Sequence, residues 1–298
     1  MSSNRGSYTT PGAFRRALTD RLKELTKTSR WSLSQLQRQM AYDRFLERLY
    51  SVNDSWVVKG ATALLAREIG VRGTLDVDVY RDAALETLET DVRSAADLDL
   101  GDWFRFEQGA TQSMDDALKG LRIPVTAYIG VTVWASFRVD LVGSDLHMTG
   151  DPEPVPPLAR VLMPDVEQHG YRAYPLVDHV ADKVVAILQR YGDSLVPSTR
   201  YRDLVDLVSI VTVASVDAVA QTAALLSEAK RRGVTLPRSF DVPDRALWEP
   251  GYAAEARRSL LASARTLDEA LATVRPFLDP VFDGGAVGRW DSNAARWS

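Results

Sequence analysis

The chain has 298 residues, of which 45% are hydrophobic and 26% charged, an ordinary composition for a folded globular protein with a substantial core. It has no cysteine, which excludes disulfides and thiolate metal sites, and its three histidines, His147, His169 and His179, lack the spacing of zinc ligands. The start, MSSNRGSYTT, lacks the apolar core of a signal peptide, and polar residues interrupt the most apolar stretch, 207–220. We therefore expect a cytoplasmic protein with no membrane partner.

Charge is distributed unevenly along the chain. Residues 1–50 contain ten Lys and Arg residues against four acids, a net charge of +6, so the remaining residues carry −10. A basic helical segment on an acidic body is typical of a protein that contacts a phosphate backbone, although such runs also occur as solvated helix faces.

Alternation and helical spacing of apolar residues predict a mixture of helices and strands in the first half of the chain. Helices are expected over residues 13–28, from a cap at Ser32 or Ser34 to Tyr50, over 61–69 with Gly70 as the stop, and over 83–98. Strands are expected over residues 56–58, 75–80, 103–106, 122–128 and 131–142.

The proline-rich stretch 150–157 marks a predicted boundary, because such a sequence is extended and cannot continue a helix or a central strand. Beyond it the pattern becomes helical. Helices are expected over 176–191, from Arg200 onward, over 216–232, and over 253–274 with a break near Thr266. The tail with Trp290 and Trp297 either docks or frays.

Two aspartates share one face of the strand predicted over 75–80. Asp76 and Asp78 are two residues apart, so their carboxylates lie roughly 6–7 Å from each other and repel by about 2.5 kcal/mol at an effective dielectric constant near 20. A hard divalent cation such as Mg²⁺ between them would remove this repulsion. The alternative is a solvated face of an edge strand.

Other charged residues have both a chemical and a structural interpretation. Asp140 is the single acid in the strand-like run 134–142 and is either a third carboxylate of the cluster or a residue of a turn. Lys183 lies beside an apolar helical stripe and either reaches into a site or extends to the surface. Asp203 and Asp206 share a helix face near the helix start, where the helix dipole alone explains one of them.

The order of these pieces resembles the AbiEii/AbiGii nucleotidyltransferase family over roughly residues 50–215. The resemblance rests on the run Lys59-Gly60-Ala61-Thr62, then Arg72-Gly-Thr74, Asp76-Val-Asp78, an acid on a later strand, Asp182-Lys183, and Asp203-Leu-Val-Asp206. This family includes the abortive-infection and mycobacterial MenT toxins and belongs to the DNA polymerase β-type nucleotidyltransferase superfamily.

The resemblance implies a role for each matching residue. Gly60 and Thr62 match the small-residue signature that holds nucleotide phosphates, with Ala61-Thr62 in place of the commoner Gly-Ser order. Asp76, Asp78 and Asp140 match the Mg²⁺ ligands, with Asp140 also a candidate to accept the proton of the attacking hydroxyl. Lys59 and Lys183 match residues that contact the triphosphate, and Asp206 matches a further acid of the site.

The implied fold is α/β (α+β) and bilobed, with N-terminal helices and a small mixed-sheet nucleotidyltransferase core over 1–157 and a mainly helical lobe that completes the site over 158–298. The implied activity is Mg²⁺-dependent transfer of a nucleotide from an NTP to the 3′ end of tRNA, by a toxin with a cognate antitoxin; the basic amino-terminal segment fits the tRNA. One alternative is modification of a small-molecule or protein hydroxyl, and a second is a non-catalytic helical nucleic-acid-binding or interaction protein.

Overall fold

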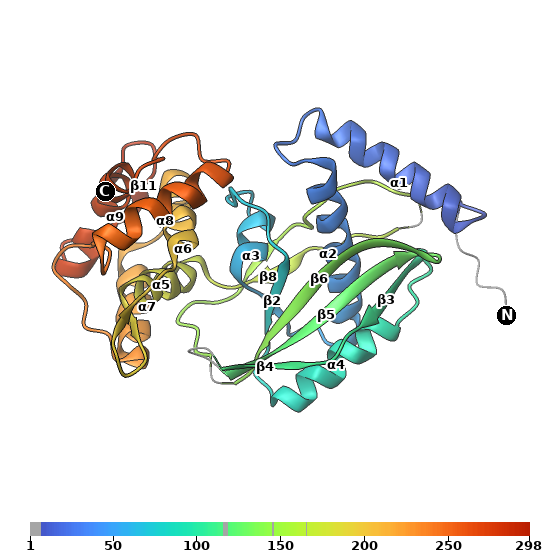
Figure 1. Ribbon diagram of the computed structural model, residues 1–298, viewed down its shortest axis with the longest axis horizontal. Helices are drawn as coiled ribbons and strands as arrows, with labels where there is room; N and C mark the ends of the chain where they lie inside the picture. The colour runs from blue at the N-terminus through green and yellow to red at the C-terminus, as the bar shows by residue number, and fades with distance from the viewer. Residues whose placement is uncertain (1–6, 116–118, 145, 165) are drawn as a thin grey trace. The chain divides into compact units, whose positions relative to one another are not determined.

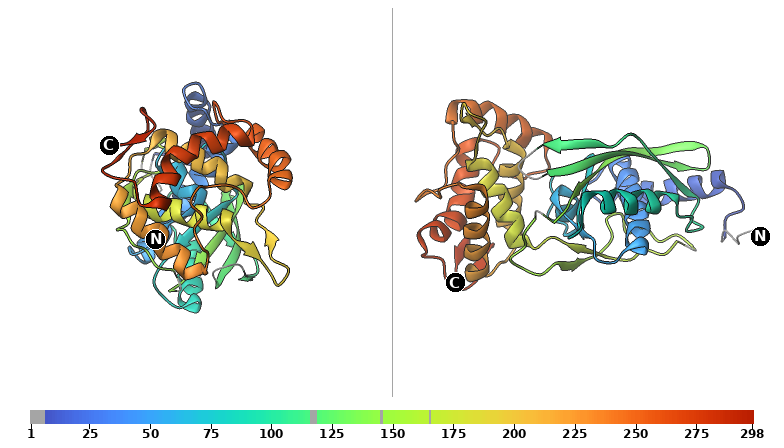
Figure 2. Two further views of the ribbon diagram at one scale, coloured as in Figure 1. Left: turned by 90° about the vertical axis from the view of Figure 1, so that its left-hand side faces the viewer. Right: turned by 90° about the horizontal axis from the view of Figure 1, so that it is seen from below.

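The computed structural model describes residues 7–115, 119–144, 146–164 and 166–298, and the chain divides into two compact units (Figures 1 and 2). The sheet unit comprises Met1–Arg67, Gly73–His147 and Pro154–Ala173. The helical unit comprises Glu68–Arg72, Met148–Glu153 and Tyr174–Ser298. Two short segments, 68–72 and 148–153, thus belong to the helical unit although the chain on both sides of each belongs to the sheet unit.

The sheet unit is built on a mixed sheet whose strand order is β3-β5-β6-β2-β1-β8-β7, with β4 also pairing with β5 (Figure 1). The β2–β6 and β1–β8 pairs are parallel, whereas β5 runs antiparallel to β3, β4 and β6. The strands are β1 (Val57–Val58), β2 (Asp76–Tyr80), β3 (Phe104–Gln108), β4 (Gln112–Asp115), β5 (Lys119–Ile129), β6 (Thr132–Val142), β7 (Glu153–Val155) and β8 (Tyr171–Ala173).

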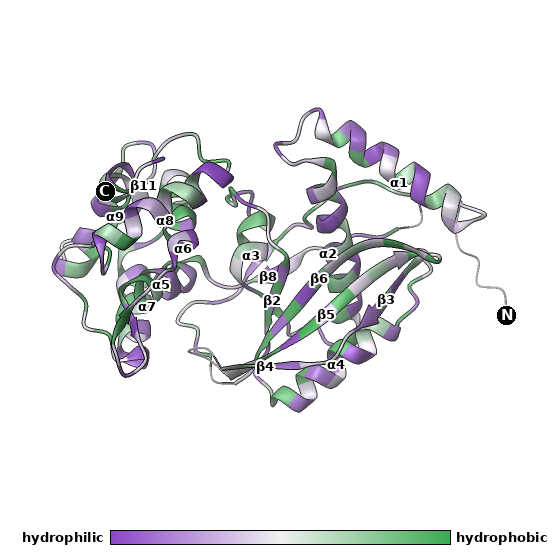
Figure 3. Ribbon diagram, viewed as in Figure 1, coloured by the Kyte–Doolittle hydropathy of each residue, from purple (hydrophilic) through white to green (hydrophobic). Residues whose placement is uncertain are grey.

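One face of this sheet is apolar and is covered by helices. Val77, Val79 and Val139 are fully buried on it, and hydrophobic and hydrophilic residues alternate along β5 and β6 (Figure 3). Helix α2 packs on β6 and α4 packs on β3, as Figure 2 shows in its right-hand view. The helices of this unit are α1 (Pro11–Thr26), α2 (Leu33–Val52), α3 (Gly60–Ala66) and α4 (Leu85–Asp97).

Part of the positive charge of the amino-terminal segment is internal. Arg44 and Arg48 of α2 are buried and share the carboxylate of buried Asp102, at 2.5 and 2.6 Å. Burial opposes ionisation of Asp102, but the two guanidinium groups outweigh it and lower its pKa. These two arginines therefore balance an internal acid and add nothing to a basic surface, and Arg5 lies outside the described residues.

The helical unit packs α5 against both α6 and α7, and α6 against α8 and α9. Side chains of Asp217, Asp244 and Thr266 cap α7, α8 and α9, and Gly233 ends α7 in the left-handed conformation. The helices are α5 (Leu176–Leu188), α6 (Tyr201–Val213), α7 (Ala218–Arg232), α8 (Arg245–Arg258) and α9 (Leu267–Asp283). The unit also contains two hairpins: β9 (Arg190–Tyr191) with β10 (Val196–Pro197) lies between α5 and α6, and β11 (Trp290–Asp291) with β12 (Arg296–Trp297) follows α9.

The carboxyl-terminal tail docks. Trp290 is buried, its ring lies 5.1 Å from that of Phe277, and its Nε1 donates a hydrogen bond of 2.7 Å to the carbonyl of Val211. Trp297 lies 4.9 Å from Phe277 and donates to its carbonyl. The two tryptophans thus anchor the β11–β12 hairpin to α6 and α9.

The α/β fold class with a mixed sheet and a mainly helical region is confirmed, but several helix ends were predicted wrongly. The helix predicted over 176–191 ends at Leu188, and the region predicted over 253–274 forms two helices, Arg245–Arg258 and Leu267–Asp283. The helix predicted over 61–69 ends at Ala66, because Glu68 adopts a φ of +62° and so takes the left-handed position expected of Gly70. The prediction missed β4, β7, β8 and the four strands of the two hairpins, β9 to β12, which are too short to show alternation.

Within the described residues, no helix is long and apolar enough to cross a membrane.

Candidate active site

The register of the sheet brings the three predicted carboxylates to one face. In the parallel β2–β6 pair, Asp78 lies opposite Asp140, and Asp76 lies opposite Arg138. Directly opposed residues of neighbouring strands, about 5 Å apart, present their side chains on the same face. Asp76, Asp78 and Asp140 therefore share the face opposite the one that α2 and α4 cover.

Two arginines from the same face are paired with these carboxylates. Arg122 of β5 lies opposite Asp140 and binds both of its oxygens, through Nε at 2.8 Å and Nη2 at 2.6 Å. The Nε of Arg138 lies 2.5 Å from Oδ1 of Asp76. The charge repulsion expected between the carboxylates is thus offset by guanidinium groups, which are the residues of the site that the sequence prediction missed.

Gly60 permits the position of Asp78. It lies at the start of α3 with a φ of +56°, and a Cβ atom added to it would lie 1.9 Å from Oδ2 of Asp78. The backbone N–H of Lys59 donates a hydrogen bond of 2.8 Å to the carbonyl of Asp78. Only glycine fits here, for both its backbone conformation and its lack of a side chain.

Thr62 and Thr74 fix the beginning of β2. Thr62 is fully buried, and its hydroxyl donates to the carbonyl of Asp76 at 3.1 Å. The hydroxyl of Thr74 accepts a hydrogen bond from the N–H of Asp76 and donates to its carbonyl. Thr62, predicted to contact phosphate, thus directs its hydroxyl to the main chain of the strand that carries Asp76.

The predicted residues of the helical unit form a cluster of their own. Lys183 of α5 is buried and forms ion pairs with Asp203 and Asp206 of α6, at 2.9 and 2.7 Å. Arg72 binds both oxygens of Asp206, at 2.9 and 2.7 Å. Lys183 therefore reaches into a buried ionic cluster and does not extend to the surface.

Burial and charge compete within this cluster. Burial raises the pKa of Asp206, but the charges of Lys183 and Arg72 and their hydrogen bonds lower it by more, so the net pKa lies below its ordinary value. Burial lowers the pKa of Lys183, whereas Asp203 and Asp206 raise it above its ordinary value. Both groups are therefore charged at neutral pH.

The donor set on the sheet fits a hard divalent cation by its chemistry, because Mg²⁺ and Mn²⁺ prefer carboxylate oxygens. Arg122 already supplies positive charge to Asp140, as Arg138 does to Asp76. Among the described residues, no group of three or more His, Cys, Asp or Glu side chains is arranged to hold a metal ion. A cation bound by both oxygens of Asp140 would therefore compete with Arg122 for them.

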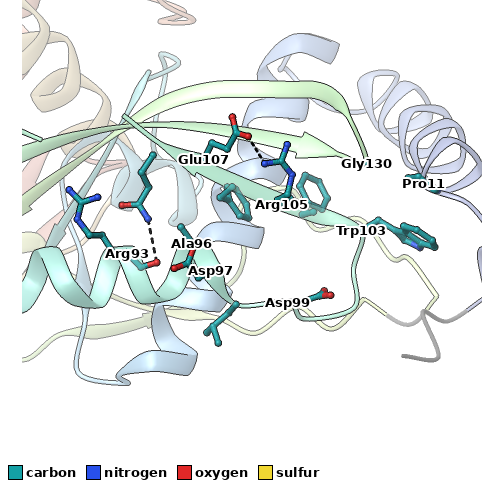
Figure 4. A pocket seen from close by; sticks show the side chains of 13 residues that line it. Pro11, Arg93, Ala96, Asp97, Asp99, Trp103, Arg105, Glu107 and Gly130 are labelled. Carbon is teal, nitrogen blue, oxygen red and sulfur yellow. Dashed lines mark hydrogen bonds and ion pairs between the residues drawn. The ribbon is translucent and has the colours of Figure 1, made fainter. Parts of the chain in front are cut away.

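A separate pocket of about 860 Å³ lies between α4 and β3 in the sheet unit (Figure 4). Arg93, Asp97 and Trp103 line it together with Arg105 and Glu107, which form an ion pair of 2.5 Å. Its lining, as far as the described residues form it, includes none of the carboxylates of β2 and β6. The pocket is thus distinct from the predicted site.

The fold is that of a nucleotidyltransferase. MenT4, a nucleotidyltransferase toxin from Mycobacterium tuberculosis, matches with a TM-score of 0.52 and 17% identity, over 87% of each chain. JHP933 from Helicobacter pylori matches with a TM-score of 0.47 and 14% identity, over 83% of this chain and 93% of its own. A comparison with curated proteins finds no match.

Sequence defines the family more closely. The model of the family described as nucleotidyl transferase AbiEii toxin, type IV toxin–antitoxin system, matches residues 44–279, which is the greater part of the chain. The protein therefore belongs to the AbiEii family of nucleotidyltransferase toxins. The match includes β2, β6 and α6, which carry the acidic residues described above.

Proposed function

We propose that this protein transfers a nucleotide from an NTP to the 3′ end of tRNA and releases pyrophosphate, so that the tRNA can no longer be aminoacylated and translation stops. Membership of the AbiEii toxin family supports nucleotidyl transfer and the existence of an antitoxin. The observation that carries the proposal is the placement of Asp76, Asp78 and Asp140 on one sheet face, with Asp78 packed over Gly60.

The chemistry follows from charge. A hydroxyl oxygen of the acceptor forms a bond to the α-phosphorus, the bond from that phosphorus to the bridging oxygen breaks, and pyrophosphate leaves. We assign Asp140 to accept the hydroxyl proton, because it lies directly opposite Asp78 on the neighbouring strand. Bound Mg²⁺, held by Asp76 and Asp78 with Asp140, would supply positive charge at the phosphates.

Exposed cations support an RNA acceptor. After the two buried arginines of α2 are set aside, Arg16, Lys23, Lys27 and Arg30 remain exposed on α1 and the turn that follows it. Lys23 and Lys27 form ion pairs with Asp20 and Glu24, but these surface pairs are weak and a phosphate backbone can replace them. We assign this helix to the tRNA backbone.

The test incubates the purified protein with MgCl₂, bulk tRNA and each of the four α-radiolabelled ribonucleoside triphosphates in turn. We expect label at the tRNA 3′ end with the wild type and with Glu107→Gln, a matched control that alters an exposed acid of the same sheet. Asp78→Asn should remove the label. Label on protein or on small molecules, but not on tRNA, would contradict the assigned acceptor.

A further inference from the structure

Arg122 and Arg138 contact carboxylate oxygens that a divalent cation would use. Arg122 binds both oxygens of Asp140, whose side chain is 8% exposed, and Arg138 binds one oxygen of Asp76. All four residues lie on one sheet face, in directly opposed pairs. A cation that binds Asp140 through both oxygens therefore competes with Arg122, and a cation that binds Oδ1 of Asp76 competes with Arg138.

The two arginines can move without unfolding the sheet. Their side chains are 33% and 42% exposed, so each retains contact with solvent while its partner carboxylate is more buried. A displaced guanidinium remains tethered to its strand next to the site. It would carry an uncompensated positive charge and five N–H donors in a geometry that matches phosphate.

Charge determines the consequence of this displacement. The three carboxylates and two arginines sum to a formal charge of −1, and one divalent cation changes this to +1. Binding of the cation alone thus weakens two ion pairs and leaves a net charge of +1, whereas simultaneous binding of an anion compensates both effects. A triphosphate supplies such an anion.

We propose that Arg122 and Arg138 hold Asp140 and Asp76 in a cation-free resting state, and that they bind triphosphate oxygens once a divalent cation has replaced them. The inference rests on the proposed nucleotidyl transfer at the same site. Cation and nucleotide then bind cooperatively, because each relieves the cost of binding the other. The arginines act as positioning residues for the nucleotide and as competitors of the cation.

A purely structural role makes a different prediction. If the arginines only neutralise the carboxylates during folding, their replacement lowers stability but leaves the coupling between cation and nucleotide unchanged. Cation affinity measured without nucleotide separates the two cases, since a competitor's removal increases it.

The experiment measures Mn²⁺ binding by the loss of the free-ion electron paramagnetic resonance signal. It compares the wild type with Arg122→Gln, Arg138→Gln and the control Arg105→Gln, which removes an exposed arginine paired with Glu107 away from the carboxylates. We expect each test variant to bind Mn²⁺ alone about fivefold more tightly. In saturating Mn²⁺, we expect each to bind α,β-methylene analogues of the four nucleoside triphosphates at least tenfold more weakly.

Each outcome gives a decision. Test variants that match Arg105→Gln in both titrations, while the wild type binds Mn²⁺ and nucleotide, would overturn the inference and leave the proposed function intact. A wild type that binds Mn²⁺ neither alone nor with any analogue would contradict the proposed function itself. A variant that fails to fold is replaced by Arg138→Lys, which keeps the charge but loses the paired N–H donors. It should weaken nucleotide binding and leave Mn²⁺ binding unchanged.

Discussion

Substitution of Gly60 by alanine tests how strictly the start of α3 positions Asp78. The new Cβ would lie 1.9 Å from Oδ2 of Asp78 and 2.6 Å from its Cγ, whereas real Cβ atoms essentially never approach another heavy atom within 3.0 Å. The carboxylate must therefore move by about 1 Å or rotate out of its position. The backbone φ of +56° adds strain for any residue with a side chain.

These two effects have different magnitudes in stability and in activity. Left-handed backbone strain at an alanine costs about 1 kcal/mol of folding free energy, and the partly exposed carboxylate can relax toward solvent, so the fold should persist. A displacement of about 1 Å at a catalytic group lowers the rate by about 100-fold. Gly60→Ala should therefore lose activity far out of proportion to its loss of stability.

Gly101→Ala is the matched control, because Gly101 also has a positive φ, +73°, but among the described residues no atom beyond its chain neighbours lies within 4 Å of its added Cβ. Both variants are compared by chemical denaturation and by initial rates of nucleotidyl transfer. Similar losses of unfolding free energy, with a large loss of rate only in Gly60→Ala, are expected. Equal rates in the two variants would refute the role of Gly60 in positioning Asp78.

Three further predictions concern the charged groups. Asp102→Asn leaves two buried arginines without a counter-charge, so it should lower the free energy of unfolding by about 3–5 kcal/mol in urea denaturation. A decrease in this free energy of less than about 1 kcal/mol would contradict the buried network. Lys183 and Arg72 hold the pKa of Asp206 below its ordinary value, so the ionised carboxylate stabilises the fold fully above the ordinary pKa, and this stabilisation is lost as the pH falls through the lowered pKa. Arg72→Met should therefore move the midpoint of acid unfolding to higher pH. An unchanged midpoint would count against the pairing. Burial raises the pKa of Asp43 from 3.8 to about 6, so between these two pH values the folded state holds a proton that the unfolded state releases. The contribution of Asp43 to the free energy of unfolding should therefore rise by about 3 kcal/mol as the pH falls from about 6 to below 4. Asp43→Asn should lose that pH dependence in denaturant titrations, and an identical pH profile would show that the carboxyl does not titrate in this range.

Local pattern was sufficient to predict the face of β2 that carries the aspartates. Alternation is a property of neighbouring residues, so Asp76 and Asp78 could be placed on one face from the sequence alone. The start of α2 is likewise local: of the two predicted cap residues, Ser32 and Ser34, Ser32 is the cap, and it forms a capping box with Gln35.

Partners that are distant in the chain could not be predicted in this way. Asp140 lies 62 residues after Asp78, and their opposition depends on the parallel register of β2 and β6, which no local pattern specifies. The same register selects Arg138 as the partner of Asp76. Arg72 and Asp206 are 134 residues apart, and the pair exists because the segment Glu68–Arg72 belongs to the helical unit.

The structural roles of glycines were predicted only in part, because a glycine's role depends on its backbone φ, which the sequence does not specify. Gly70 was predicted as the stop of a helix, but the left-handed position belongs to Glu68, a residue type that rarely adopts it. Gly60 was matched to a signature that holds phosphates, but the atom that approaches it in the structure is Oδ2 of Asp78, which the pairing of β1 with β2 places there.

The central claim is that the carboxylates of β2 and β6 support nucleotidyl transfer, whichever hydroxyl is the acceptor. The most direct measurement compares the fate of α- and γ-labelled nucleoside triphosphates with MgCl₂ and a total RNA and protein extract as the acceptor pool. We expect the α label to join an acceptor while the γ label is released as pyrophosphate, and Asp78→Asn to abolish both. Transfer of the γ label, or α labelling that persists in Asp78→Asn, would contradict the claim.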